Sequence, residues 1–189
     1  MNLNVKLILA SGSPRRRELL SREGISFDLQ PSQVEELPPG AREPEKLATE
    51  NSLLKARDIL AKNTDPEAII LGSDTIVVIE GQTLGKPRDL AEGAAMLRLL
   101  AGRWHEVMTG FALISHQKEK VFLETTRVRF QELSDQEISD YQDAVHVLDK
   151  AGGYAIQDGG ERIIAEVVGC RDNVMGLPVG RVLTELNQF

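Results

Sequence analysis

Hydrophobic residues along the chain follow two spacings, which separate candidate strands from candidate helices. The first apolar run, at residues 5–9, leads into a stretch of small residues that ends at Ser13. Ser13 suits a helix N-cap and Pro14 the first helical position, so we expect a helix from Pro14 to about Glu23. The chain therefore begins as a buried strand, a tight turn and a helix N-terminus.

The rest of the chain alternates between the two spacings. Further strands are predicted over residues 25–30, 67–71 and 75–79, as a hairpin over 105–115 and 121–133, and as strand, turn and strand over 152–169. Further helices are predicted over residues 45–62, 90–100, 134–144 and 179–186. Gly72 and Ser73 are expected to break the chain between two strands, and residues 31–44 to form a proline-rich loop.

Strands and helices that alternate around one antiparallel hairpin predict an α/β fold, with a mixed, twisted sheet and flanking helices in two lobes. The chain has 189 residues, enough for one domain of ordinary size. No internal repeat, low-complexity tract or linker divides the sequence. A single domain over residues 1–189 is therefore expected.

Composition and charge narrow the possible functions. Apolar residues make up 41% and charged residues 27%, as in ordinary soluble proteins. A formal net charge of -7 argues against a broad basic face for nucleic acid. The apolar runs are too short for a membrane span, and the first residues lack the pattern of a signal peptide. The single cysteine, Cys170, favours a reducing compartment, so we expect a cytoplasmic protein with no nucleic-acid or membrane partner.

Three consecutive arginines, residues 15–17, follow the small-residue turn. A helix N-terminus exposes unpaired N–H groups and a partial positive charge, which suits phosphate. Arg15 and Arg16 stand where guanidinium groups could grip phosphate oxygens, although a solvated basic face is the alternative. The stretch matches neither the P-loop nor the dinucleotide-binding fingerprint.

Other polar residues are ambiguous one by one. Asp74 follows the predicted strand break, where a carboxylate could bind a metal, deprotonate a water or merely cap a turn. Lys55 lies on a predicted helix and Lys86 before a proline-fixed turn. Glu35 belongs to a glutamate pair in the proline-rich loop, where such pairs are usually solvated. Gln157 carries an amide that can read a base edge.

Eight short stretches, taken in order, resemble one family. They are "LASGSPRR", "VEE", "LLKA", "GSDTIV", "GKP", "HEVMTG", "DKAGGYAIQ" and "NVMGLP". Together they resemble the Maf family of nucleoside triphosphate pyrophosphatases over about residues 7–186. The resemblance implies a two-lobed α/β fold with a central cleft, similar to inosine triphosphate pyrophosphatases. It also implies a metal-dependent hydrolase that splits a nucleotide between its α- and β-phosphates.

The resemblance implies roles for individual residues. Asp74 matches the family's general base. The other phosphate- and metal-site positions fall on Ser11, Arg16, Glu35, Lys55 and Lys86. A Mg²⁺ or Mn²⁺ ion is implied, with Asp74 and Glu35 as its ligands. The cations and the metal would offset about four negative charges of a triphosphate.

Substrate preference depends on fewer positions. Arg15, Thr75 and Gln157 match the specificity positions of the branch that acts on dTTP and UTP. Gln157 could accept a hydrogen bond from the N3–H of thymine or uracil and donate to a carbonyl, whereas Arg15 can only donate. Modified pyrimidine nucleotides, the 7-methyl-GTP branch and a non-catalytic, nucleotide-sensing regulator of septum formation stay as alternatives. A homodimer is also implied.

Three conspicuous residues are predicted to have no catalytic role. Cys170 has no identifiable base beside it, so a buried or neutral thiol is expected rather than a nucleophile. Cys170 and Arg171 also depart from the residues that the family often has there, which puts the outer wall of the pocket in doubt. His105 and Trp104 are expected to pack at a strand start.

Overall fold

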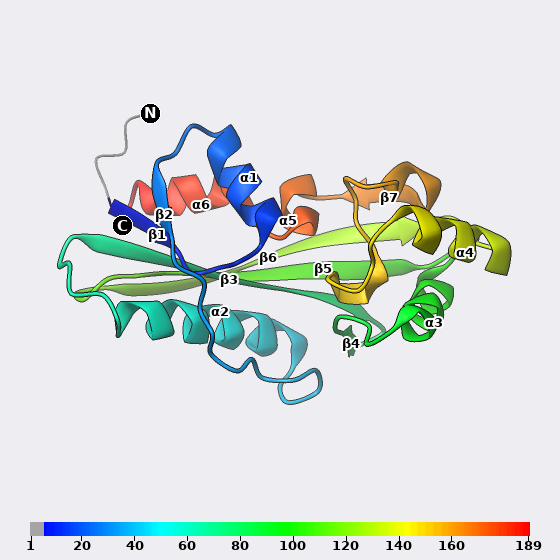
Figure 1. Ribbon diagram of the computed structural model, residues 1–189, viewed down its shortest axis with the longest axis horizontal. Helices are drawn as coiled ribbons and strands as arrows, with labels where there is room; N and C mark the ends of the chain where they lie inside the picture. Colours follow the sequence, from blue (N-terminus) through cyan, green and yellow to red (C-terminus); the bar gives the residue numbers. More distant parts are fainter. Residues whose placement is uncertain (1–5) are drawn as a thin grey trace.

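A seven-stranded mixed sheet runs along the length of the molecule (Figure 1). The computed structural model describes residues 6–189, so Val5 of the first predicted strand lies outside the described residues. The strands are β1 Lys6–Leu9, β2 Phe27–Leu29, β3 Ala68–Ile79, β4 Gln82–Leu84, β5 Trp104–Ile114, β6 Glu119–Phe130 and β7 Ile164–Val168. Their order is β2-β1-β3-β5-β6-β7, with β4 paired to β3 off this path.

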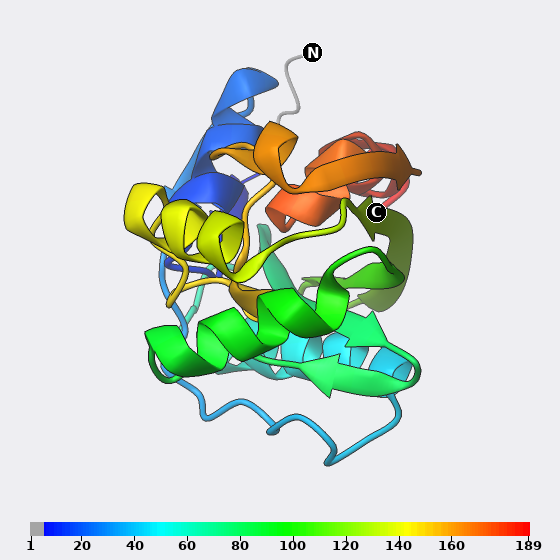
Figure 2. The same ribbon diagram turned by 90° about the vertical axis from the view of Figure 1, so that its right-hand side faces the viewer.

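Helices cover both faces of this sheet (Figure 1, Figure 2). They are α1 Pro14–Arg22, α2 Pro44–Leu60, α3 Leu90–Leu100, α4 Asp135–Ala144, α5 Arg171–Met175 and α6 Val179–Leu186, with 3₁₀ turns η1 Ala151–Gly153 and η2 Gly160–Arg162. Alternate residues of β3 point to opposite faces. Ile70 and Ile76 belong to apolar clusters under α2, whereas Leu71 packs with α1 and α6. Val77 packs with α3 and α4 farther along the strand.

The face opposite α2 therefore carries two apolar cores with a polar layer between them. Thr109 Oγ1 lies 3.0 Å from Thr75 Oγ1 and donates to the Asn173 carbonyl at 3.1 Å. The Asn173 amide donates in turn to the Val107 carbonyl and to Thr126 Oγ1. These bonds satisfy polar groups that burial would otherwise penalise, and they fix α5 across the middle of the sheet.

Most predicted elements are confirmed, because each carries a strong local signal. Asp89 is the N-cap of helix α3, and its side chain accepts from the Glu92 backbone N–H at 2.8 Å. Helix α4 has the predicted capping box between Ser134 and Glu137. The hairpin of β5 and β6, the helices α1, α2 and α6, and the strand that ends at Ile79 also form as expected.

Two predictions are wrong. The chain does not break at Gly72 and Ser73, because β3 continues from Ala68 to Ile79 and pairs with β5 through both residues. The segment ahead of residue 159 forms no strand. Gly152 and Gly153 both have positive φ, 70° and 72°, which turns the chain into η1 instead. The short helix α5, from Arg171 to Met175, was not predicted.

Candidate active site

The candidate active site lies where one edge of β3 changes partner. β1 pairs with β3 up to Leu71, and β4 pairs with it again from Val77. Between them, residues 72–76 present an edge without a partner strand, while β5 covers the opposite edge. Asp74 therefore lies in the middle of a strand, and the prediction that it lies at a strand end is wrong. The neighbouring β1 does end there, so the site still opens at a strand terminus.

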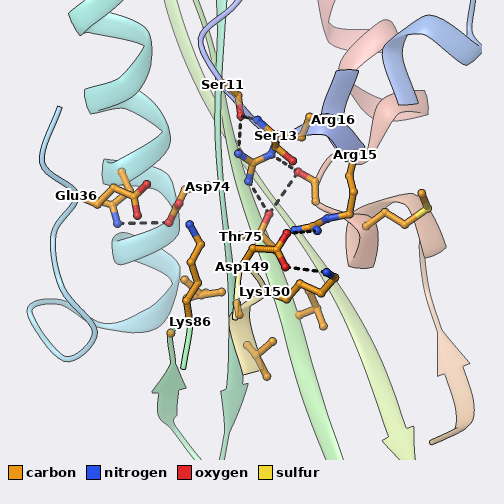
Figure 3. A pocket seen from close by; sticks show the side chains of 18 of the residues that line it. Ser11, Ser13, Arg15, Arg16, Glu36, Asp74, Thr75, Lys86, Asp149 and Lys150 are labelled. Carbon is orange, nitrogen blue, oxygen red and sulfur yellow. Dashed lines mark hydrogen bonds and ion pairs between the residues drawn. The ribbon is translucent and has the colours of Figure 1, made fainter. Parts of the chain in front are cut away.

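A cavity of about 480 Å³ opens at this edge, a size typical of small-molecule sites. Most of the predicted site residues line it: Ser11, Arg15, Arg16, Lys55, Asp74, Thr75, Lys86 and Gln157. Glu35 is exposed and lies outside this lining, whereas Glu36 belongs to it. The side chains come from β1, α1, α2, β3 and the loops before α2, after β4 and around η1 (Figure 3).

A charged cluster forms one side of the cavity. The Lys55 Nζ lies 2.6 Å from Asp74 Oδ1 and 2.7 Å from Glu36 Oε1. The side chains of Lys55 and Asp74 are only 11% and 9% exposed. A buried pair of this kind loses much hydration, so its retention at a cavity wall points to chemistry rather than to stability.

Helix α2 delivers two polar side chains to Asp74 from positions one turn apart. Lys55 is the first, and Asn51 is the second, with its Nδ2 donating to Asp74 Oδ2 at 3.3 Å. The same Asn51 amide accepts from the Leu37 N–H at 2.8 Å and donates to the Leu37 carbonyl at 3.1 Å. Asn51 thus connects the loop before α2 to the carboxylate of Asp74.

Two glycines allow α2 to approach the sheet this closely. A Cβ on Gly72 would lie 2.1 Å from the Ser52 carbonyl oxygen, and one on Gly110 would lie 2.2 Å from that of Ala48. Gly110 pairs with Asp74 across β3 and β5. The glycine predicted to break the strand therefore serves helix packing.

The loop before α2 places Glu36, rather than Glu35, beside Lys55. Asp58 anchors the start of this loop by accepting from Ser32 Oγ at 2.7 Å. Burial by itself would raise the pKa of Glu36, but the charge and hydrogen bond of Lys55, with the charge of Lys86, lower it below its usual value. The prediction of Glu35 as a site residue is therefore corrected to Glu36. Adjacent residues of an extended loop point in different directions, and the sequence does not determine which one faces inward.

Arg16 makes three hydrogen bonds to other groups of the protein. Its guanidinium donates to the Gly176 carbonyl at 2.8 Å, to Ser11 Oγ at 3.0 Å and to Thr75 Oγ1 at 3.1 Å. Burial lowers its pKa from the ordinary value, and the charge of Asp74 partly opposes this shift. Arg16 joins β1, β3 and α5 at the wall of the cavity, and an arginine's five donors leave N–H groups for a ligand.

The N-terminus of α1 faces the same cavity without a cap. Ser13 makes no side-chain capping bond, and the first turn contains no acidic residue. Arg15 and Arg16 stand in that turn instead, and both line the cavity. Unpaired N–H groups, the helix dipole and the guanidinium groups all favour an anion here.

A second charged cluster lies across the cavity from Asp74 (Figure 3). Asp149 Oδ2 lies 3.2 Å from an Arg15 nitrogen, and its Oδ1 lies 2.7 Å from Lys150 Nζ. Burial alone would raise the pKa of Asp149, but Lys150 and Arg15 lower it. Gln157 also lines the cavity, where its amide donates to Asp158 Oδ2 at 2.9 Å.

No group of three or more His, Cys, Asp or Glu residues suited to a metal occurs within residues 6–189. Magnesium needs no such cage, since it keeps several waters and binds through one or two carboxylates plus substrate phosphates. Glu36 and Asp74 converge on the same ammonium group and supply two such carboxylates. The donor set at this wall therefore fits Mg²⁺ or Mn²⁺.

Four residues of the site were not predicted: Glu36, Asn51, Asp149 and Lys150. The quoted stretches "VEE" and "DKAGGYAIQ" contain three of them, so their positions carried a signal without an assigned role. Asn51 precedes Lys55 by one helical turn, and this spacing could have identified it.

The conspicuous residues outside the site are structural, as expected. His105 is 2% exposed, its Nε2 lies 2.7 Å from the Tyr154 hydroxyl, and burial lowers its pKa to about 4. Trp104 packs against the Arg127 guanidinium. Cys170 is a half-buried free thiol outside the cavity lining, and its backbone N–H and carbonyl both bond to Thr126 Oγ1.

Known proteins provide three comparisons. A family model described as "Maf-like protein" matches residues 6–189. Two proteins called dTTP/UTP pyrophosphatase, from Bacillus anthracis and Bacillus cereus, are each 44% identical over 184 residues, or 97% of this chain and 95% of theirs. The structure of the Staphylococcus aureus Ham1 protein has a TM-score of 0.56 at 13% identity, covering 97% of this chain and 98% of that one, which shows a shared fold. A match of this extent and identity identifies this chain as a member of the Maf family.

Proposed function

We propose that this protein hydrolyses nucleoside triphosphates, preferentially dTTP and UTP, to the monophosphate and pyrophosphate. The observation that carries the proposal is the buried pair of Lys55 and Asp74 at the wall of a cavity that also receives an uncapped helix N-terminus. A carboxylate able to accept a proton and an anion site able to hold phosphates are the two parts that phosphate-anhydride hydrolysis needs. The printed name of the Bacillus relatives supports the substrate class.

In the proposed reaction, the Asp74 carboxylate takes a proton from a water, whose oxygen attacks the α-phosphorus. The bond between that phosphorus and the oxygen bridging to the β-phosphate breaks, and the electron pair leaves on pyrophosphate. Lys55 holds the carboxylate in place through its 2.6 Å contact. Lys86 and the N-terminus of α1 stabilise the charge that grows on the leaving group.

Asp74 and Glu36 would hold the divalent cation. When bound, such an ion polarises phosphate oxygens and neutralises part of their charge. Glu36 reaches this position because Asn51 and Asp58 fix its loop to α2.

A panel of nucleoside triphosphates with Mg²⁺ or Mn²⁺, scored for pyrophosphate release, tests the proposal. We expect dTTP and UTP to be cleaved faster than GTP, 7-methyl-GTP and unmodified CTP. A kcat/KM ratio of dTTP over 7-methyl-GTP below one would identify the other branch. Tight nucleotide binding without turnover of any nucleotide would favour the regulator of septum formation.

Three further points belong to the proposal. Modified pyrimidine nucleotides are included as substrates, to be tested in the same panel. A nucleotide substrate and a single cysteine support a cytoplasmic location. Among residues 6–189, no helix has the length and apolar character needed to cross a membrane.

The homodimer stays a prediction, which light scattering of the purified protein would test.

A further inference from the structure

The cavity has two charged walls with different chemistry. Asp74, Lys55 and Glu36 form the wall assigned above to the phosphates and the metal. Arg15 and Asp149 belong to the second wall, which Figure 3 shows apart from the first. A nucleotide whose triphosphate lies at the first wall must place its base elsewhere in the same cavity.

The second wall carries a carboxylate paired with two cations. Asp149 is the acceptor in the middle, with Arg15 on Oδ2 at 3.2 Å and Lys150 on Oδ1 at 2.7 Å. Arginine and lysine side chains only donate, and an ionised carboxylate only accepts. Because Lys150 Nζ is taken up by Asp149 and by the His146 carbonyl, the groups left for a ligand are Arg15 as a donor and Asp149 as an acceptor.

The imide edge of uracil or thymine complements this pair, because it places an accepting carbonyl beside a donating N3–H. Its O4 and O2 accept, and the N3–H between them donates. In cytosine, position 4 carries an amino donor and N3 is an unprotonated acceptor, so both would face groups of the same kind here. The order of groups on this wall thus favours uracil and thymine over cytosine.

Asp149 is able to take part because its carboxylate is accessible. The side chain is 48% exposed, and each oxygen uses one of its two acceptor sites on a protein donor. Lys150 is much less exposed, at 8%, and its Nζ also donates to the His146 carbonyl at 2.5 Å. Lys150 therefore fixes the carboxylate, while Arg15 keeps free N–H groups for a base carbonyl.

Gln157, the residue expected to read the N3–H, is arranged differently. Its side chain is exposed, and its Nε2 donates to the neighbouring Asp158 carboxylate. No hydrogen bond joins it to Arg15 among the described residues. Asp149, in contrast, is held against Arg15 at the cavity wall.

We propose that Asp149 is a specificity-determining residue, which accepts the N3–H of the uracil or thymine base and disfavours cytosine. This inference rests on the proposed function, and it assigns to Asp149 the role that the sequence suggested for Gln157. Arg15 would donate to an adjacent carbonyl of the base.

The first test is the ratio of kcat/KM for UTP over CTP in the wild type and in Asp149→Asn. An amide can turn its NH₂ toward the N3 of cytosine, so we expect the ratio to fall at least tenfold, mainly through the two KM values. Asp143→Asn is the matched control, because it removes an equal charge from an exposed residue outside the cavity lining. That control should keep the wild-type ratio.

An unchanged ratio in Asp149→Asn would overturn the inference. So would a ratio that collapses in Gln157→Ala but not in Asp149→Asn. In case the variant does not fold, the triphosphate of N3-methyluridine probes the wild type, since it lacks the N3–H. Its kcat/KM should be at least tenfold below that of UTP, and equal values would also overturn the assignment.

Binding of the monophosphates separates this inference from the proposed function. Titration calorimetry without metal should show UMP binding several-fold more tightly than CMP to the wild type, and about equally to Asp149→Asn. If no triphosphate is hydrolysed, the proposed function fails, whereas this difference would still support the role of Asp149. Equal binding of UMP and CMP to the wild type would refute it, whatever the turnover.

Discussion

Two polar clusters are buried against opposite faces of the same sheet, and they are built differently. On the α2 face, Lys55 and Asp74 keep opposite charges in contact beside an open cavity. On the other face, His105 and Tyr154 share one hydrogen bond between neutral groups. His105 lies among apolar side chains, and Tyr154 also borders the cavity. These four side chains are almost wholly inaccessible to solvent, so burial alone does not distinguish the two pairs.

The difference lies in the charge that each cluster carries. His105 is packed edge-on against the rings of Phe130 and Tyr154, and burial lowers its pKa to about 4, so it is neutral at pH 7. The cluster at Asp74 holds its charges next to a space that can admit a ligand. Charge is costly to bury, and the molecule retains it where a substrate can use it.

The largest effect should come from removing the proton acceptor of the charged cluster. Asp74→Asn keeps the size of the side chain but abolishes general-base action, so turnover should fall about a hundredfold to ten-thousandfold. Steady-state pyrophosphate release measures this change. Asp65→Asn, which lies in an exposed pair with Lys6, is the control and should be close to wild type. Near-normal turnover in Asp74→Asn would remove the chemical distinction between the two clusters.

The neutral cluster should make the free energy of unfolding depend on pH. The pKa of His105 is about 4 when folded and near 6.5 when unfolded, so the unfolded chain binds more protons between these values. Stability is therefore complete above pH 6.5 and is lost as pH falls toward 4, by about 3 kcal/mol from this residue. Urea unfolding at several pH values would measure it.

His105→Gln removes the titrating ring, so its stability should depend less on pH over the same range. His116→Gln serves as the control, because His116 is exposed to solvent and lies outside the apolar cluster around His105. Parallel pH curves for the wild type and His105→Gln would contradict a buried neutral histidine.

A smaller effect is expected at the phosphate cations. Lys86→Ala should raise KM for the triphosphate about tenfold while preserving the fold, since one charge–phosphate contact contributes about 1–3 kcal/mol. Lys55→Ala should lower kcat more strongly, because it also leaves Asp74 and Glu36 facing each other without a cation. Initial rates over a range of substrate concentrations separate the two parameters. If both variants behave as wild type, these lysines are only part of the surface.

The smallest effect should follow from loosening the loop that carries Glu36. Asp58→Ala removes the acceptor for Ser32 Oγ and for the Gln33 N–H, at a cost of about 1 kcal/mol. KM for the triphosphate should rise a few-fold, with kcat nearly unchanged. Arg57→Ala is the matched control, because Arg57 lies on the same helix as Asp58 and loses only an exposed ion pair with Glu119 of β6. Equal KM values in the two variants would show that this loop does not contribute to substrate binding.

Sequence and structure agree best where a signal is local. A capping box between Ser134 and Glu137, or a proline at the start of α1, acts within one helical turn and needs no tertiary partner. The family motifs likewise assigned Asp74, Lys55 and Lys86 to one site, and the structure places all three at one cavity.

The tertiary structure decided what depends on distant segments. Gly72 looked like a strand break, but the backbone of α2 is what requires a residue without a side chain at this point. Glu36 faces Lys55, rather than Glu35, because Asn51 and Asp58 fix the direction of the loop. Such choices depend on packing between residues far apart in the chain, and local spacing carries no record of it.

The sequence by itself determined the kinds of element, the family and most of the chemistry at the site. The fold decided which of these side chains contact each other. Arg15 and Asp149 are 134 positions apart, yet they lie side by side at the cavity wall. Hydrogen bonds and ion pairs act over a few ångströms, so the role of Asp149 depends on the tertiary structure, which brings the two segments together.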